Sequence, residues 1–323
     1  MHNVMAKKLL ILGNGFDIDL GMKTKYSDFA KSHYWDDLME NVYGGVQHDL
    51  LSVLKDAKEK EAWFDIEQVI YEYVTSLGNL GYDAKTDREE FDRLVESLTN
   101  YLNYIQKKQV YDVGSVALRV LREVVESGSY QIYSFNYTRL QNITDSVGFK
   151  IEPNAITHMH GSLDNRSIIL GILTDPLVSI LDEYSFLYKD NSRFYMPNNM
   201  YEDFDKASDI IFFGHSINGM DFPYFKDFFI KQSGMDGEYK RKKITVFTYD
   251  DNSDMQIRNS IRRAQVDLTQ LFRRNDIYFI QTKKIYDNDE VEKEKYDTAM
   301  KSIRNSKNAY IVNSIHSNNP FSW

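Results

Sequence analysis

The stretch KKLLILGNGFD, residues 7–17, decides the fold of this chain. Its apolar run has the length of a buried strand, and it leads directly into a turn that carries Gly13 and Gly15. A buried strand that ends in a glycine-rich turn is the usual start of an α/β nucleotide-binding fold with parallel strands. Because glycine has no Cβ, such a turn lets the backbone approach a phosphate closely. A tight turn with only a structural role is the alternative.

Two familiar phosphate-binding motifs do not fit this turn. The dinucleotide fingerprint needs a third glycine where this chain has Ile18, and the next glycine here is Gly21. No Gly-Lys-Ser or Gly-Lys-Thr follows, which excludes a Walker loop. What remains is a strand-to-loop turn. The residues that we expect to contact a ligand there are Gly13, Asn14, Gly15, Phe16 and Asp17.

Strand and helix signals divide the rest of the chain. Residues 26–126 carry apolar side chains at helical spacing and predict a large helical insertion. Short runs rich in β-branched and aromatic residues predict buried strands at 130–135, 155–159, 168–172, 209–213, 244–249 and 277–280. A helix predicted at 253–274 separates the last two strands, and strand, helix, strand at this spacing indicates a parallel sheet. We therefore predict a Rossmann-type α/β domain over residues 1–285 and a charged tail, 286–323, that forms a solvated helix.

The composition excludes several classes of protein. The 323-residue chain has a net charge of −9, which argues against a protein that coats nucleic acid. Cysteine is absent, which excludes disulfides, thiolate nucleophiles, iron–sulfur clusters and cysteine-based zinc sites. The apolar runs are too short for a signal peptide or a membrane span. We therefore expect a globular protein of the reducing cytoplasm.

Polar residues follow two of the predicted strands. Asn136, in the string SFNYT, can orient a water or a ribose hydroxyl through its amide, or it can cap the helix that follows. His158 and His160 lie two residues apart, so on a strand they would point to the same face, as a metal pair does. No further ligand pattern nearby completes a metal site. A single general base at His160 is the better interpretation.

Two more strand ends carry small polar loops. The loop after the predicted strand 209–213 can bind phosphate through its backbone N–H groups and its serine hydroxyl. The residues that we expect to contact a ligand there are Gly214, His215, Ser216 and Asp221. At the second, Asp250 can accept hydrogen bonds from a ribose, although a helix N-cap explains the acidic residues there equally well. The carboxyl ends of parallel strands meet at one edge of a sheet, so we expect these motifs to share one crevice.

The ordered set of motifs resembles the bacteriophage abortive-infection AbiH family. The resemblance is carried by GNGFD at 13–17 with the residues just after it, then by SFNYT, His-x-His-Gly and Gly-His-Ser-x-Asn-x-x-Asp. It covers roughly residues 5–285. It implies a role in antiviral defence, with a phage-derived trigger or a defence-system partner.

The order of the motifs is also similar to sirtuin-like NAD-binding domains. Sirtuins have glycines at the same spacing in their opening turn, and Asn136, His160 and Ser216 match their Asn, His and Ser. In that family the Asn and the His act on the nicotinamide-ribose side of NAD. The four-Cys zinc module of sirtuin deacetylases is missing here, and YSDFA at 26–30 lacks the Arg of their Pro-Asp-Phe-Arg segment. The resemblance therefore implies a sirtuin-like domain that binds and hydrolyses NAD rather than a protein deacetylase.

The mechanism that the resemblance implies needs no metal. Asn136 would position the water or the ribose, and His160 would act as general base. Asp17 or Asp221 would stabilise the cation-like transition state, and Glu67 of the helical insertion is a weaker candidate for that role. The glycine turn would hold the pyrophosphate and Asp250 the adenosine ribose.

Two alternatives stay open beside NAD hydrolysis. One is a non-catalytic sensor that binds NAD or a related nucleotide and changes its assembly. The other is an interaction or nucleic-acid module, whose only basic feature is a cluster that comprises Arg258, Arg262, Arg263, Arg273 and Arg274. Charged side chains on a solvated helix explain that cluster more simply, so we do not expect binding to nucleic acid. We also expect a homo-oligomer that does not contact a membrane.

Overall fold

The computed structural model describes residues 7–42, 49–60, 65–77, 83–164, 167–174, 180–195, 198–217, 219–234 and 239–317. Its centre is a parallel sheet of six strands in the order β3-β2-β1-β4-β5-β6. The strands are β1 (Lys7–Leu12), β2 (Tyr130–Ser134), β3 (Ile156–His158), β4 (Ala207–Phe213), β5 (Lys243–Thr248) and β6 (Asp276–Gln281). The order reverses at β1, which pairs with β2 on one side and β4 on the other. The predicted Rossmann-type α/β fold is confirmed, and the strand reversal creates the edge position where such sheets bind ligands.

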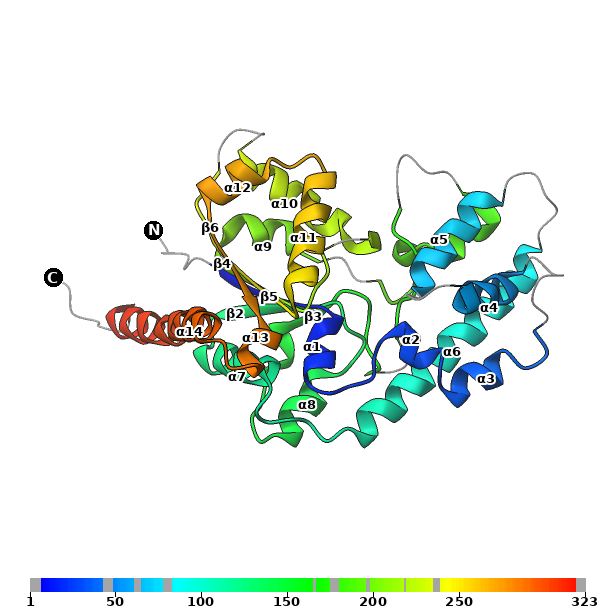
Figure 1. The fold of residues 1–323 in the computed structure, drawn as a ribbon, viewed down its shortest axis with the longest axis horizontal. Helices are drawn as coiled ribbons and strands as arrows, with labels where there is room; N and C mark the ends of the chain where they lie inside the picture. The colour runs from blue at the N-terminus through cyan, green and yellow to red at the C-terminus, as the bar shows by residue number, and fades with distance from the viewer. Residues whose placement is uncertain are drawn as a thin grey trace.

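Helices cover both faces of the sheet because side chains of β1 alternate between them (Figure 1). Leu10 and Leu12 pack on one layer, and Leu9 and Ile11 pack on the other. The first layer contains α1 (Asn14–Asp19), α7 (Val116–Ser127), α8 (Leu140–Ser146), α13 (Thr282–Tyr286) and α14 (Glu290–Ser317). The second contains α9 (Met200–Lys206), α10 (Pro223–Ser233), α11 (Asp251–Arg263) and α12 (Leu268–Arg274).

A separate helical unit projects from the carboxyl edge of the sheet, at the right of Figure 1. Its helices are α2 (Tyr26–Phe29), α3 (His33–Leu38), α4 (Leu50–Lys60), α5 (Ile66–Ser76) and α6 (Ala84–Lys108). Side chains from the described residues between 163 and 187, which follow β3, complete its hydrophobic core, and this stretch includes the 3-10 helix η3 (Asp182–Leu187). We call the described residues of these two stretches, 26–108 and 163–187, the helical unit. The helices predicted for residues 26–126 are therefore present, and α7 within that range packs on the sheet.

Two local predictions were wrong. Residues 168–172 form no sheet strand. The side chains of Ile168, Leu170 and Ile172 enter the core of the helical unit, and Ile172 makes an isolated bridge to Tyr188. The helix predicted at 253–274 is two helices, because Gln265 adopts a left-handed φ of 64° that ends α11. Asp267 then caps α12 by accepting a hydrogen bond from the backbone N–H of Gln270.

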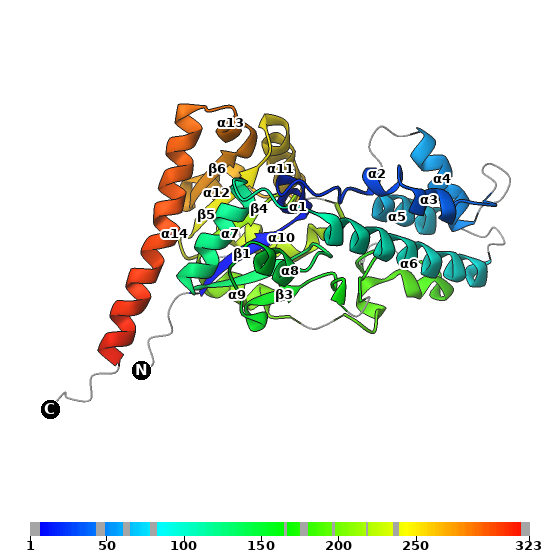
Figure 2. The ribbon, with the colours of Figure 1, turned by 90° about the horizontal axis from the view of Figure 1, so that it is seen from below.

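The charged tail is helical as predicted, but one face of α14 is buried. Tyr296, Met300 and Ile303 pack into the same core as α7, and Arg304 makes an ion pair with Glu123 of α7. Figure 2 shows α14 lying alongside the sheet domain and extending beyond it. Between residues 290 and 305 the solvated-helix interpretation therefore holds for the opposite face only, and residues 318–323 of the predicted tail lie outside the described residues. Within the described ranges, no helix has the length and apolar composition that crossing a membrane requires.

Candidate functional site

The loops that follow β1 and β4 interlock through glycine backbones. Gly13 and Gly15 donate backbone hydrogen bonds to the carbonyls of Phe213 (3.0 Å) and Gly214 (2.8 Å). Gly214 has a φ of +62°, and a Cβ there would lie 2.4 Å from the carbonyl carbon of Gly15. Both loops therefore need glycine so that the backbones can touch. A role of this turn in holding a phosphate stays a prediction, and Asn218 of the Gly-His-Ser string lies outside the described residues.

Asn136 lies just beyond β2 and contacts the interlocked loops. Its Nδ2 donates a hydrogen bond to the carbonyl oxygen of Gly13 at 3.1 Å. Its Oδ1 is buried and has no hydrogen-bond partner among the described residues. The N-cap of α8 is Arg139, so helix capping does not explain Asn136. A buried acceptor without a partner is costly, and this oxygen is available to a ligand's donor.

Asp17 is a buried carboxyl group on α1, beside the same loops. Thr138 Oγ1 donates to both of its oxygens, at 3.1 and 2.9 Å. Burial raises the pKa of Asp17 to about 7, and the hydrogen bonds from Thr138 and Asn136 only partly oppose this rise. Asp17 can therefore exchange a proton near neutral pH.

His160 lies just beyond β3, and the turn η5 (Gly219–Asp221) brings a carboxylate to it. The Nε2 of His160 is 3.1 Å from Oδ1 of Asp221. His158, on the strand itself, has its pKa lowered by burial. Within the described residues no group of three or more His, Asp or Glu side chains could hold a metal ion.

His215 and Ser216 follow β4 but face different surroundings. His215 is buried, its Nδ1 accepts a hydrogen bond from the N–H of Ile217, and its Nε2 lies 3.9 Å from Asp221. Burial lowers its pKa to about 4, so the imidazole is neutral at physiological pH. The Phe135 ring lies edge-on to His160 and His215, with centroid distances of 5.3 and 4.5 Å. Ser216 is exposed.

Two further charged residues, one in the helical unit and one just after it, complete the cluster. Lys189, in the 3-10 helix η4 (Lys189–Asn191), has a fully buried ammonium 3.0 Å from a carboxylate oxygen of Glu67. The same ammonium is 3.3 Å from His160 Nε2 and 3.5 Å from Asp221. We call Glu67, His160, Lys189 and Asp221 the charged cluster. Sequence reasoning missed Lys189 and ranked Glu67 low, because neither follows a strand of the sheet.

The charges in this cluster are strongly coupled. Loss of solvent opposes ionisation of Asp221, yet its interactions with His160 and with the Lys189 ammonium hold its pKa well below the usual range. Burial also disfavours the Lys189 ammonium, but Glu67 and Asp221 outweigh it and raise its pKa. The cluster thus places a fixed carboxylate against an imidazole, an arrangement suited to proton transfer and to stabilising a cation.

Asp250 is the N-cap of α11. Its Oδ1 accepts hydrogen bonds from the N–H and the hydroxyl of Ser253, both at 2.9 Å. Asn14, at the start of α1, accepts a hydrogen bond from the Thr24 hydroxyl. These contacts account for both side chains structurally, and their roles toward a ligand stay predictions.

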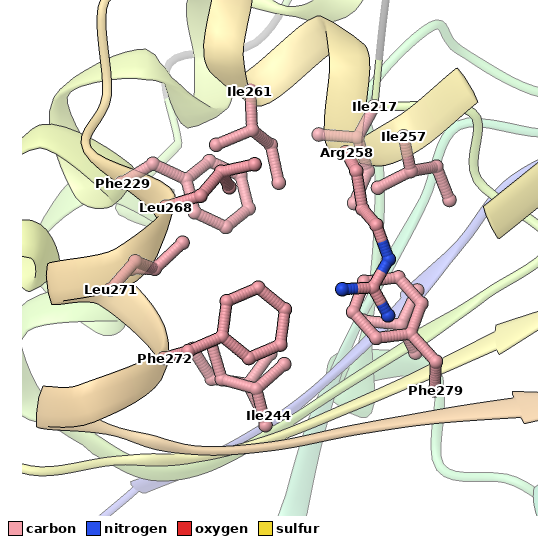
Figure 3. A pocket seen from close by; sticks show the side chains of 12 residues that line it. Ile217, Phe229, Ile244, Ile257, Arg258, Ile261, Leu268, Leu271, Phe272 and Phe279 are labelled. Atoms are coloured by element: carbon pink, nitrogen blue, oxygen red, sulfur yellow. The ribbon is translucent and has the colours of Figure 1, made fainter. Parts of the chain in front are cut away.

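Two cavities lie away from these residues. Figure 3 shows an apolar one between α11, α12 and β6, where the guanidinium of Arg258 lies 4.0 Å from the ring centre of Phe279. A second, of about 370 Å³, lies between the start of α7 and α13–α14 and is lined by Arg119, Tyr286 and Lys293, among others. Neither is lined by Asn136, His160 or Asp221. Arg258 of the predicted basic cluster also pairs with Asp254, which supports a structural role for it.

Comparison with known proteins identifies one family. The family model described as bacteriophage abortive infection AbiH matches residues 9–247. The matched range contains strands β1 to β5 almost completely, together with Asn136 and the whole charged cluster. No curated protein and no solved structure matches the chain.

Proposed function

The chain belongs to the bacteriophage abortive infection AbiH family, and from that premise we propose that its part in phage defence is the hydrolysis of NAD. The bond cleaved is the one between nicotinamide and ribose. Loss of NAD would stop the metabolism of an infected cell before the phage completes its cycle.

One observation carries the proposal: an amide, an imidazole and an ionised carboxylate from three separate segments of the chain lie at the same edge of the sheet. Asn136 follows β2 with an unpartnered oxygen, and His160 follows β3. Asp221 lies against His160 from η5, on the far side of the strand reversal. The likeness of this ordered set to the Asn and His of sirtuin-like NAD-binding domains supports nicotinamide-ribose as the group that they act on. In α/β sheets of this order, ligands bind at this edge.

The proposed reaction needs only water as co-substrate. The C1′–N bond breaks and its electron pair goes to the pyridine ring of nicotinamide. The water oxygen forms a bond to C1′, and its proton goes to His160. The products are nicotinamide, ADP-ribose and a proton.

The remaining predicted residues would bind the rest of the substrate. Asp221 would stabilise both the protonated His160 and the cation-like ribose, because its own charge is fixed. Asn136 would accept a hydrogen bond from the water or a ribose hydroxyl. The loops at 13–17 and 214–216 would hold the pyrophosphate, and Asp250 the second ribose.

A second candidate is a sensor that binds NAD or a related nucleotide without cleaving it. The burial of Asn136 and His160, with exposed fractions of 5% and 4%, favours it. A site so covered would have to open before a ligand enters. Opening on binding is a device by which a sensor changes its assembly.

The decisive experiment measures NAD in cells before and after phage challenge. We expect NAD to collapse after challenge in cells with the wild-type protein, and to persist with Asn136→Ala or His160→Ala, since losing a general base lowers turnover by about 10²–10⁴-fold. His33→Ala is the matched control, because this histidine is exposed and lies in the helical unit. Unchanged NAD together with intact protection would refute the hydrolysis and favour the sensor.

A further inference from the structure

Lys189 carries a charge into the interior of the protein from a loop. Its side chain has no exposed surface, and the ammonium lies among three ionisable groups of the charged cluster. Removing an ammonium from water costs several kcal/mol unless partners replace the lost hydration. The buried ammonium therefore depends on the neighbouring groups that replace its hydration.

The backbone fixes Lys189 from one short segment of the helical unit. Its N–H donates to the carbonyl of Ile172 at 2.8 Å, and the N–H of Ile172 donates to Leu187 at 2.9 Å. The N–H of Gly171, one residue earlier, donates to Glu67 at 3.3 Å. Lys189 and its carboxylate partner are therefore anchored to two adjacent residues, Lys189 to Ile172 and Glu67 to Gly171.

Glu67 is held equally firmly from its own side. Asp65 caps α5 by accepting hydrogen bonds from the N–H groups of Glu67 and Gln68, which places Glu67 in the first turn. The glutamate side chain is buried and meets the ammonium with both of its oxygens at 3.0 Å. Lys189 therefore has little freedom to move away from His160.

The contacts at Nε2 of His160 demand opposite states of that nitrogen. An ammonium can only donate, so the 3.3 Å contact with Lys189 is attractive when Nε2 carries a lone pair. The 3.1 Å contact with Asp221 is attractive when Nε2 carries a proton. In the structure Lys189 has hydrogen-bond geometry to Nε2. Oδ1 of Asp221 is also close to Nε2, but this pair does not meet the geometry of an N–H hydrogen bond.

We propose that Lys189 is a positioning residue that keeps Nε2 of His160 unprotonated until the site takes up a proton. In the resting state Lys189 donates to Nε2, and the ring carries its hydrogen on Nδ1. When Nε2 takes the proton from water, the new N–H donates to Oδ1 of Asp221, and Lys189 remains on Glu67. This role rests on the proposed function, in which His160 is the general base.

The groups that face His160 are consistent with this exchange. Besides Lys189, Asp221 and Glu67, the neutral His215 lies across the Phe135 ring. The uncharged rings of Tyr137 and Tyr224 flank the imidazole, with centroid distances of 6.4 and 6.3 Å. Lys189 is thus the group in this set that donates a charged hydrogen bond to the histidine.

The test compares the wild type with the double variant Glu67→Gln, Lys189→Met, which removes both charges of the buried pair together. Side-chain ¹⁵N spectra of histidine-labelled protein, recorded with the imidazoles in their neutral form, report which ring nitrogen carries the hydrogen. His160→Gln assigns its signals. Lys189→Arg, whose guanidinium can still donate, is the conservative variant. Lys242→Met is the matched control, because Lys242 is also buried but donates to the carbonyls of Asp205 and Ala207.

We expect the hydrogen on Nδ1 in the wild type, Lys189→Arg and Lys242→Met, and on Nε2 in the double variant. We also expect the double variant to lose at least about tenfold in kcat for NAD with little change in KM, because proton transfer rather than binding is altered. If the hydrogen occupies the same nitrogen in the wild type and in the folded double variant, the proposal is overturned. A wild type that binds but never cleaves NAD would refute the hydrolysis, and the spectra would still decide the role of Lys189.

Discussion

Asp17 and Asp221 lie at the same edge of the sheet, and burial disfavours the ionised form of both, yet their pKa values move in opposite directions. The pKa of Asp17 rises to about 7, whereas that of Asp221 stays well below the usual range. Asp17 accepts hydrogen bonds from the neutral hydroxyl of Thr138. Asp221 lies beside the imidazole of His160 and the ammonium of Lys189.

The difference shows that neutral donors do not replace the hydration of a carboxylate, whereas a nearby cation does. The two aspartates therefore suit different tasks. Asp17 can gain or lose a proton near pH 7, and Asp221 remains an anion throughout the physiological range. If the proposed hydrolysis is right, Asp221 is the one of these two aspartates that can stabilise a cationic ribose throughout the physiological pH range.

The largest effect is expected from Lys189→Met, which removes the cation beside Asp221. Glu67 and Asp221 then lose their buried counter-ion, and we expect the free energy of unfolding at neutral pH to fall by about 3–5 kcal/mol. Chemical denaturation measures the loss. The double variant with Glu67→Gln should recover part of it, because Asp221 is then the one carboxylate of the charged cluster that still lies opposite the apolar side chain. A single variant as stable as the wild type would show that the ion pair contributes nothing to the fold.

A second test isolates Asp17 by its pH dependence. The folded pKa of about 7 lies above the ordinary 3.8, so the folded protein binds this proton more tightly than the unfolded chain. Its contribution is complete below about pH 4 and is lost as the pH rises to about 7 and above. Between pH 5 and 8 we expect the wild type to lose about 2–3 kcal/mol that Asp17→Asn does not lose. Urea denaturation across that range measures the difference, and two parallel curves would contradict the assignment.

The smallest effect sharpens the role of the neutral donor. Thr138→Val removes the hydroxyl that contacts both oxygens of Asp17. We expect a further rise of the pKa of Asp17 and a loss of about 1 kcal/mol at pH 8, where the carboxylate is ionised. Thr138→Ser keeps the hydroxyl and serves as the control. If the valine variant is as stable as the serine variant at pH 8, the donor has no measurable effect on the carboxylate.

Much of the sheet could be predicted from local sequence. The apolar run of β1, the glycine turn after it and all five of the other strands have patterns that local composition determines. The run at 168–172 has the same composition, but Gly171 has a φ of 135° and approaches the carbonyl of Leu187 too closely for any Cβ. Its burial comes from the helices around it, so the pattern alone could not separate it from a strand.

The site was predictable only where its residues follow strands. Asn136, His160 and Asp221 were found because parallel strands deliver their carboxyl ends to one edge. Lys189 reaches the site through a backbone bridge within the helical unit, and its surrounding sequence is polar and unremarkable in pattern. The position of such a residue depends on tertiary structure, and no local sequence motif predicts it.

The helical unit also sets an order in which the chain can complete itself during synthesis. Its core draws on residues 163–187 as well as on α3 to α6, and Tyr184 donates a hydrogen bond to the buried Asp87 of α6. A nascent chain that has not yet extended past Leu187 therefore lacks part of that core. Helices α3 to α6 are synthesised first, and they cannot complete their common core until β2, β3 and the residues after β3 have been translated. The charged cluster needs Lys189 and then Asp221, so a growing chain that has not yet reached residue 221 cannot assemble it.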